Sequence, residues 1–331
     1  MSIHTAIERL DYRTAESVSP GHPDKLCDQI SDAILDAYLT VDANARVAVE
    51  ACGGHGTVFL TGEVTAGQYV DVVPIVKRLA GEDVEIIEHI VKQSPEIARG
   101  VDTGGAGDQG IMVGYACNET PELLPLETVL ARQLNQHLFD QWPFDGKTQV
   151  TLRNGIIESI VASFQNVDQA SLKQAVESWL KETAGLAVSP EVRLHINPAG
   201  DWSQGGFDAD AGLTGRKLVV DNYGPGVPIG GGCFSGKDAT KVDRSAAYMA
   251  RRVAVDYLRK NNAKEVYCYL AYAIGYDQPL EATVIVDGVQ QIVEGYDLSP
   301  RGIIEALDLK KPQYEQTARY GHFGHGFAWD K

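Results

Sequence analysis

The chain has 331 residues, enough for two or three domains, and 44% of them are hydrophobic, as in ordinary globular proteins. With 45 acidic against 29 basic residues, the formal net charge of -16 repels nucleic acids and anionic membranes at long range. We therefore expect neither nucleic acid nor a membrane as a partner. A polyanionic ligand would have to be held by local positive charge.

The five cysteines form no C-x-x-C pair and have no histidines at ligand spacing, which argues against a disulfide framework or a zinc site and favours a reducing compartment. No run of about 18 apolar residues is present to span a bilayer, and the N-terminal sequence MSIHTAIERLDYR lacks the apolar core of a secretory signal. These features predict a cytoplasmic protein.

Hydrophobic periodicity predicts a helix over residues 23–38, after the turn Ser19-Pro20-Gly21, and then a hairpin of strands over 46–52 and 57–65. Further helices are expected at 69–79, 84–92, 123–140, 169–182, 241–261 and 303–307. Further strands are expected at 111–116, 148–152, 156–162, 217–221, 265–273 and 281–286. This mixed order predicts an α+β fold. Three glycine-rich connections, 93–110, 197–215 and 223–236, are long enough to be functional or mobile loops.

The segment from Gly231 to Asp238, GGCFSGKD, is close to the phosphate-binding pattern G-x-x-x-x-G-K-[ST]. Asp238 replaces the hydroxyl residue that would hold a metal, and no clear buried strand precedes the loop. A genuine P-loop is therefore not favoured. Phosphate binding and a structural glycine turn capped by Asp238 both remain open.

Cations and carboxylates are interleaved around this loop. Lys241, Asp243 and Arg244 follow it, and Arg216 and Lys217 end the preceding glycine-rich zone. Lysine and arginine bind phosphate oxygens and aspartate binds hard cations, so the mixture suits a magnesium-bound polyphosphate. The alternative is a solvated helix face.

Near the N-terminus, His22, Asp24 and Lys25 surround the start of the first helix, where free N–H groups and the helix dipole favour anions. Asp24 could equally be a helix-capping residue, and His22 an ordinary loop histidine. Glu50 and Glu63 lie among apolar neighbours in the strand-like runs, where an unpaired buried carboxylate is unfavourable. Either a lysine or arginine neutralises them, or they contact a bound cation and the amino group of a ligand.

Five segments identify a family when they are taken together. They are ESVSPGHPDKLCDQISDAILD at 16–36, GAGDQGIMVGYACNET at 105–120, GLTGRKLVVDNYG at 212–224, GGGCFSGKDATKVDRSAAY at 230–248 and YGHFG at 320–324. In these segments the chain resembles the S-adenosylmethionine synthetases (methionine adenosyltransferases) of bacteria and eukaryotes, and the blocks extend over nearly the whole chain.

The resemblance implies three similar α+β domains related by an approximate threefold axis, each with a sheet packed with helices. It implies an N-terminal domain at 11–95, a mobile active-site loop at 96–110, a central domain at 111–205 and a C-terminal domain at 206–331. It also implies a homodimer whose chains share their active sites, or a homotetramer. The implied reaction is attack of methionine sulfur on the ribose C5′ of ATP, with loss of the triphosphate and its hydrolysis to phosphate and diphosphate.

The family pattern also implies the residues of the site. ATP is expected to contact His22, Asp145, Lys147, Asp201, Trp202, Asp210, Arg216, Lys217, Cys233 and Lys237. Those expected to act in catalysis are His22, Lys147, Arg216, Lys217 and Lys237, because they would surround the departing triphosphate. Methionine is expected to contact Glu63, Gln93, Asp108, Asp210 and Lys241. Two Mg²⁺ ions per site are expected, with Asp24 and Asp243 as ligands, and a K⁺ ion at Glu50.

Several departures from the common bacterial form, among them a short 80–91 segment and Cys233 in the glycine loop, bear on these expectations. The 93–110 segment is several residues shorter, the chain stops at Lys331 where many relatives continue, and Asp201 brings an acidic group near the expected polyphosphate. The shorter segments and the earlier end bear on loop gating and on contacts between dimers. Two other readings therefore stay open: an ATP-dependent phosphotransferase or NTPase, and a catalytically silent ATP-binding member of the family.

Overall fold

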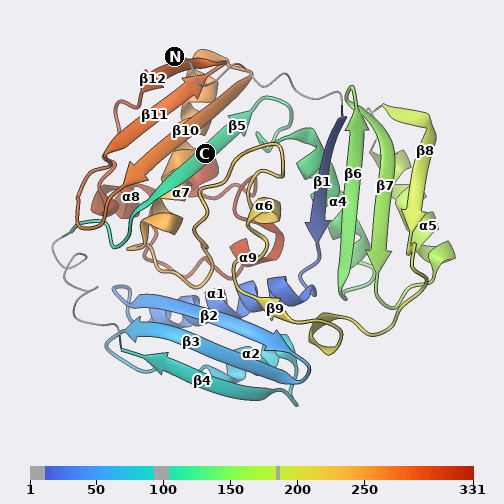
Figure 1. Cartoon of the computed structure of the whole chain (residues 1–331), viewed down its shortest axis with the longest axis horizontal. Coiled ribbons are helices and arrows are strands. Elements are labelled where there is room, and N and C mark those ends of the chain that lie inside the picture. The colour runs from blue at the N-terminus through green and yellow to red at the C-terminus, as the bar shows by residue number, and fades with distance from the viewer. Residues whose placement is uncertain (1–11, 93–103, 184–186) are drawn as a thin grey trace.

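The computed structural model describes residues 12–92, 104–183 and 187–331. These residues form three four-stranded sheets around a central region that holds α1 (Pro23–Val41), α6 (Leu218–Asp221) and α9 (Thr317–Tyr320) (Figure 1). The chain therefore passes through the centre of the molecule three times: near its N-terminus with α1, again with α6, and near its C-terminus with α9.

The first sheet has the order β4-β3-β2-β9. Its antiparallel hairpin consists of β2 (Arg46–Gly54) and β3 (Thr57–Thr65), after which α2 (Val73–Ala80) crosses over to β4 (Glu85–Val91), which runs parallel to β3. The short strand β9 (Gly212–Leu213) completes the other edge. A parallel neighbour requires such a crossover, which the helix supplies.

The second sheet repeats this plan with the order β1-β6-β7-β8. Its hairpin of β6 (Gly146–Arg153) and β7 (Ile156–Phe164) is followed by α5 (Gln169–Glu182) and by the parallel strand β8 (Val188–Ile196). The edge strand is β1 (Tyr12–Val18), and α4 (Leu126–Phe139) packs on β1 and β6.

The third sheet, β12-β11-β10-β5, is antiparallel throughout. Its strands are β5 (Gly110–Cys117), β10 (Glu265–Tyr272), β11 (Glu281–Val286) and β12 (Val289–Ile292), and its helices are α7 (Val242–Asn261) and α8 (Pro300–Leu307). Gly114 of β5 touches α7, because a Cβ there would lie 2.0 Å from the Ala250 carbonyl oxygen. Single 3₁₀ turns, η1 (Gly206–Asp208) and η2 (Ala328–Asp330), complete the elements described.

Each sheet borrows an edge strand from a distant part of the chain. The N-terminal β1 joins the second sheet, β5 joins the third sheet, and β9 returns to the first sheet. The strands are exchanged in a cycle, so that none of the three units forms a complete sheet alone. This arrangement confirms the expectation of an α+β fold with three similar domains.

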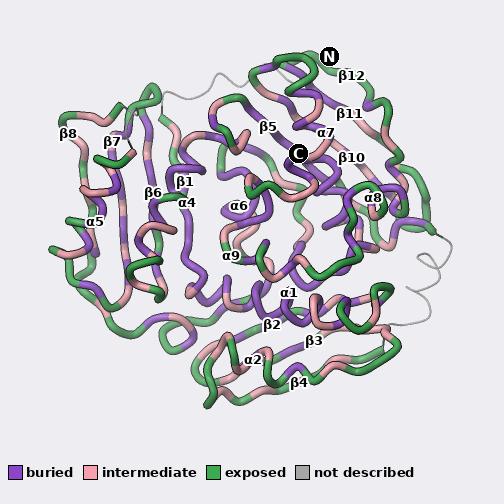
Figure 2. Tube along the Cα trace, turned by 180° about the vertical axis from the view of Figure 1, so that it is seen from behind, coloured by how far each residue is buried: buried purple, intermediate pink, exposed green. Residues whose placement is uncertain are grey.

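The buried residues form two clusters. The larger cluster joins α1 and α7 with the first and third sheets, and the smaller lies between the second sheet and the helices α4 and α5. Figure 2 shows the same distribution, with burial along most of α1 and exposure along β4 and β12. The helix α1 is therefore at once part of the core and a central support for the loops around it.

Two expected elements differ from the structure. Residues 84–92 were expected to be helical, but they form β4, because Ile86 and Ile90 pack inward while the whole segment pairs with β3. Residues 217–221 were expected to be a strand, but they form the single helical turn α6, which buries Val220. In both segments a short apolar run fits either period, and tertiary pairing decides the structure.

Candidate active site

The N-terminus of α1 is built by His22, which caps the helix. Its Nδ1 accepts a hydrogen bond of 3.1 Å from the backbone N–H of Asp24, and Pro23 occupies the first helical turn. Gly21 lets this turn lie against the beginning of β6, since a Cβ there would lie 2.9 Å from the backbone N of Asp145. The helix start therefore adjoins the β6 segment that carries Lys147, which pairs in register with Val18 of β1.

Two cations reach the same helix start from the loop after β9. Lys217 forms a short ion pair with Asp24, and the Arg216 Nε lies 3.3 Å from Oδ1 of the same carboxylate. The backbone N–H of Leu213 donates to that oxygen at 3.0 Å. Burial raises the pKa of Asp24, but the bonds from Lys217 and Leu213 outweigh it, so that the pKa lies below its ordinary value and the group stays ionised.

The imidazole of His22 is neutral at physiological pH. Burial, and after it the positive charges of Lys217 and Lys147, lower its pKa to about 3. Because Nδ1 accepts the hydrogen bond from Asp24, the proton of the neutral ring is on Nε2. His22 therefore offers an uncharged N–H donor inside a group of cations.

The residues expected to contact the adenosine part of ATP include Asp145, which directly precedes β6, and Asp201 and Trp202. Asp145 accepts a bond of 3.0 Å from the Gly206 N–H, and burial raises its pKa. The indole N–H of Trp202 donates to Asn197 Oδ1 at 3.4 Å. Asp201 is exposed and accepts a bond from the same asparagine, which places its carboxylate against Asn197.

A second group of charges surrounds the start of α7. The Lys237 Nζ lies 2.7 Å from Asp243 Oδ2, and Lys241 forms a short ion pair with Asp238. Asp238 is buried and also accepts the N–H groups of Val47, at 2.6 Å, and of Thr240, at 2.8 Å. Asp238 therefore anchors the turn to β2, as the structural alternative for this residue predicts. No strand leads into residues 229–236, unlike in a P-loop.

The backbone places Lys237 on the face of the first sheet opposite α1. Lys237 forms an antiparallel bridge with Ala48 of β2, and Ala48 is directly opposite Glu63 of β3. Residues opposite one another share a face, so Lys237 and Glu63 project to the same side, about 10 Å apart across two strand spacings. Glu50 is two residues along β2 on this face.

The two carboxylates of this face are more accessible than their apolar neighbours suggest. Glu50 is exposed and Glu63 is only half-buried, while the alternate residues of β2, Val47 and Val49, are buried against α1. Because the sheet has an open face, solvent can reach both carboxylates, and Glu50 needs no partner to offset burial.

The two charge groups meet where Gly215 faces Cys233. A Cβ on Gly215 would lie 2.7 Å from Cys233 Sγ, and Gly215 has a φ of +81° that favours glycine. Burial raises the pKa of the Cys233 thiol, so that this residue acts as an apolar spacer. The loop of Arg216 and the loop of Lys237 are thus in direct contact.

Two other expected ligand residues are on the surface. Asp108 and Asp210 are exposed, and each accepts a bond from the backbone N–H of the next residue. Gln93 lies outside the described residues, as does the 96–103 part of the expected mobile loop.

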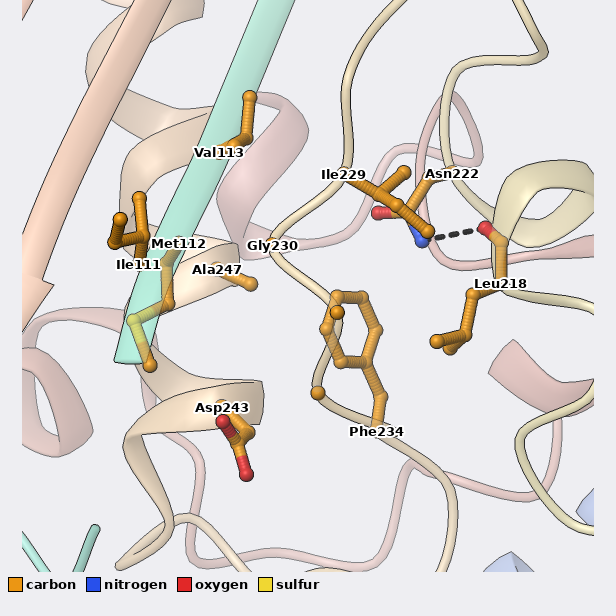
Figure 3. Close-up of a pocket in the computed structure, with 12 residues that line it drawn as sticks. Ile111, Met112, Val113, Leu218, Asn222, Ile229, Gly230, Phe234, Asp243 and Ala247 are labelled. Carbon is orange, nitrogen blue, oxygen red and sulfur yellow. Dashed lines mark hydrogen bonds between the residues drawn. The ribbon is translucent and has the colours of Figure 1, made fainter. Parts of the chain in front are cut away.

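A crevice beside Asp243 is narrow. Figure 3 shows it between β5, the start of α7 and the glycine-rich loop, with Met112, Phe234 and Ile229 on its walls. Its volume of about 10 Å³ is room for no more than one water molecule. The crevice is therefore too small for a nucleoside or an amino acid.

Among the described residues there is no group of three histidine, cysteine, aspartate or glutamate side chains able to hold a metal. Asp24 and Asp243 each supply one carboxylate beside lysines. Magnesium is commonly bound by one or two carboxylates together with substrate phosphates and water. The donor set therefore fits magnesium that arrives with a polyphosphate.

Fold and site together define a three-domain α+β protein that gathers lysine, arginine and isolated carboxylates around positions suited to a metal-bound polyphosphate. Three family models match the chain: the N-terminal domain of S-adenosylmethionine synthetase at residues 11–95, its central domain at 103–202 and its C-terminal domain at 204–331. The chain belongs to the S-adenosylmethionine synthetase family, which confirms the resemblance seen in the sequence. The helices of the described residues include none that is both long and apolar enough to cross a bilayer.

Proposed function

We propose that this chain synthesises S-adenosyl-L-methionine from ATP and L-methionine, as its family membership supports in general terms. The observation that carries the proposal is the neutral N–H of His22 among Asp24, Lys147, Arg216 and Lys217. A leaving triphosphate gains charge as its bond to carbon breaks, and donors and cations already in place stabilise that charge.

In the proposed reaction, a lone pair of the methionine sulfur forms a bond to ribose C5′. The electrons of the C5′–O bond leave with the triphosphate, and the sulfur becomes a sulfonium. The Nε2–H of His22 donates to the bridging oxygen, while Lys147, Arg216 and Lys217 hold the phosphate chain together with Lys237. Water then divides the triphosphate into phosphate and diphosphate. No covalent enzyme intermediate is needed, because positioning and charge supply the rate enhancement.

The metals have assigned places in this proposal. Asp24 and Asp243 would each bind one magnesium ion, and Glu50 would bind potassium. Bound magnesium supplies positive charge that the leaving triphosphate requires. Lys217 and Lys237, which are paired with these aspartates in the structure, would then be available to contact phosphate oxygens.

The substrates would be held by the remaining residues. We assign the adenosine to Asp145, Asp201, Trp202 and Cys233. We assign methionine to Glu63, Gln93, Asp108, Asp210 and Lys241. The shared sheet face of Glu63 and Lys237 supports this assignment, because it brings a group for the methionine amine near a group for the triphosphate.

A second copy of the chain would complete the site. The crevice beside Asp243 is itself too narrow for either substrate. The open face of the first sheet also exposes Phe59, Ile87 and Val91, which an interface would cover. We propose a homodimer with shared active sites, with a homotetramer as two such dimers, and light scattering at micromolar concentration distinguishes the two.

The test is to incubate the purified protein with ATP, magnesium, potassium and methionine, and to follow the products by chromatography. We expect S-adenosylmethionine and diphosphate in equal amounts, both dependent on methionine. Formation of ADP without an adenosyl product would show a phosphotransferase or NTPase instead. Retained ATP binding with no turnover would show a silent family member.

A further inference from the structure

The helix α1 presents four aspartates at intervals of four residues, and each accepts backbone N–H groups from the C-terminal part of the chain. Asp24 accepts from Leu213, Asp28 from Gly215 at 2.8 Å and Asp32 from Gly236 at 2.8 Å. Asp36 accepts from Gln313, Tyr314 and Glu315 at 2.9 to 3.0 Å. We call these four residues the aspartate row.

Like charges at this spacing on a helix repel one another, and Asp28 and Asp32 are also buried. Each therefore has a cationic partner. The Lys25 Nζ lies 3.1 Å from Asp28 and 2.7 Å from Asp221 of α6, and Arg244 of α7 forms bonds of 2.6 and 2.8 Å with Asp32. Asp28 and Asp32 therefore belong to a buried network that joins α1 to α6 and α7.

The segments held by Asp28 and Asp32 carry the proposed phosphate-binding cations. Gly215 immediately precedes Arg216 and Lys217, and Gly236 immediately precedes Lys237. Arg244 also donates to the carbonyl oxygen of Lys237 at 3.1 Å. The backbone is therefore held at the N–H of Gly236 and at the carbonyl of Lys237, on both sides of the peptide bond that joins them. Successive members of the row are about 6 Å apart along the helix, which gives the two segments a common rigid reference.

Close packing leaves these segments little freedom. Gly236 has a φ of +81°, and a Cβ there would lie 1.9 Å from the Val49 carbonyl oxygen of β2. A Cβ on Gly212, just before Leu213, would lie 2.1 Å from the carbonyl oxygen of Pro23 at the start of α1. The segments are therefore packed between β2 and α1, and their hydrogen bonds to the aspartate row fix their position along α1.

We propose that Asp28 and Asp32 are positioning residues for the reaction. Asp28 holds the segment of Arg216 and Lys217 through the N–H of Gly215, and Asp32 holds the segment of Lys237 through the N–H of Gly236. Together they set the distance between these two segments. The inference rests on the proposed function, since it concerns the binding of the triphosphate. It gives these residues a role although they do not touch the substrate. A misplacement of about 1 Å at such a contact can lower a reaction rate about 100-fold.

The chain supplies its own control. Asp36 is in the same row, on the same helix, and accepts backbone N–H groups in the same way, but the segment it holds carries no residue assigned to the site. If the row serves stability alone, loss of Asp36 and loss of Asp28 should affect activity alike. If Asp28 positions the cations, only its loss should affect phosphate binding.

The experiment compares Asp28→Ala with Asp36→Ala. Lys25 keeps Asp221 as a partner in the first variant, so the buried cation is not left unpaired. Magnesium tripolyphosphate is titrated calorimetrically into each protein, thermal unfolding is measured in parallel, and kcat and KM are determined. We expect Asp28→Ala to weaken tripolyphosphate binding about tenfold and to lower kcat at least as much, with KM for methionine within twofold of the unchanged protein.

We expect Asp36→Ala to unfold at a lower temperature, yet to bind tripolyphosphate within twofold of the unchanged protein. Equal weakening of binding in the two variants, or none in Asp28→Ala, would overturn the proposal. If Asp28→Ala does not fold, Asp28→Leu, which is closer in size to aspartate and also lacks an acceptor for the Gly215 N–H, is used under the same criteria. Synthesis of S-adenosylmethionine by the wild-type protein tests the proposed function separately. Failure of the proposed function can therefore be distinguished from failure of the positioning role of Asp28.

Discussion

Replacement of Lys237 by methionine isolates one cation of the proposed triphosphate site. The side chain is about one-fifth exposed, and its Nζ already approaches a carboxylate oxygen of Asp243 to 2.7 Å. A phosphate oxygen at a similar distance would gain about 6 kcal/mol of Coulomb energy at an effective dielectric constant of about 20. Desolvation and partial exposure offset part of this energy, and loss of one such contact in other enzymes lowers kcat about 10²- to 10³-fold, or about 3–4 kcal/mol.

We therefore predict that Lys237→Met lowers kcat about 10²- to 10³-fold. The fold should remain, because a partly exposed ion pair contributes about 1 kcal/mol or less to stability. Initial rates of S-adenosylmethionine formation at saturating ATP and methionine measure the effect, and thermal unfolding reports stability. The matched control is Lys173→Met, which removes an exposed ion pair with Glu177 on α5 and should leave the rate unchanged. A rate within threefold of the unchanged protein for Lys237→Met would refute the role of Lys237 as a triphosphate contact.

Three further predictions follow from named contacts. Asp243→Asn should raise the magnesium concentration needed for half-maximal activity several-fold, and an unchanged metal titration would remove Asp243 from the metal site. The His22 imidazole should not titrate in NMR spectra between pH 8 and about 5, because burial and the nearby cations lower its pKa to about 3. The pKa of a histidine in the unfolded chain is about 6.5, so the neutral His22 side chain gives its full stabilisation above that pH and loses it as the pH falls toward about 3. An imidazole titration centred near pH 6.5 in the folded protein would contradict this prediction. Gly114→Ala should destabilise the protein by about 1–3 kcal/mol, since its Cβ would lie 2.0 Å from the Ala250 carbonyl oxygen, and denaturant unfolding at an unchanged midpoint would disprove the close contact.

Local patterns identified most of the long elements. The helix from Pro23 and the hairpin of β2 and β3 follow directly from apolar periodicity, although α1 is buried on its polar side as well. The segment from Glu85 to Val91 was misread, because its apolar residues occur on both faces of an edge strand and mimic helical spacing. The strands β1 and β9 were not expected at all, because their pairing partners lie far away in the sequence and only the folded chain brings them together.

For the site, residue types and family likeness indicated the cations, but not their supports. The spacing of Asp24, Asp28, Asp32 and Asp36 is visible in the sequence, and four aspartates on one helix face would be unfavourable without partners. Nothing local reveals that those partners are the backbone N–H groups of loops almost 200 residues or more away. The sequence likewise could not predict that Asp238 is buried, because its hydrogen bond from Val47 and its ion pair with Lys241 depend on how the turn packs against β2.

The central claim, that sulfur attacks C5′ and the whole triphosphate leaves, is tested most directly with ATP labelled with ¹⁸O at the oxygen that bridges C5′ and the α-phosphorus. The protein is incubated with this ATP, methionine, magnesium and potassium, and the products are examined by mass spectrometry. We predict that all of the label appears in phosphate and diphosphate, because the C5′–O bond breaks and S-adenosylmethionine retains no bridging oxygen. Label that stays in an adenosine-containing product such as ADP would show cleavage at phosphorus and contradict the proposed reaction.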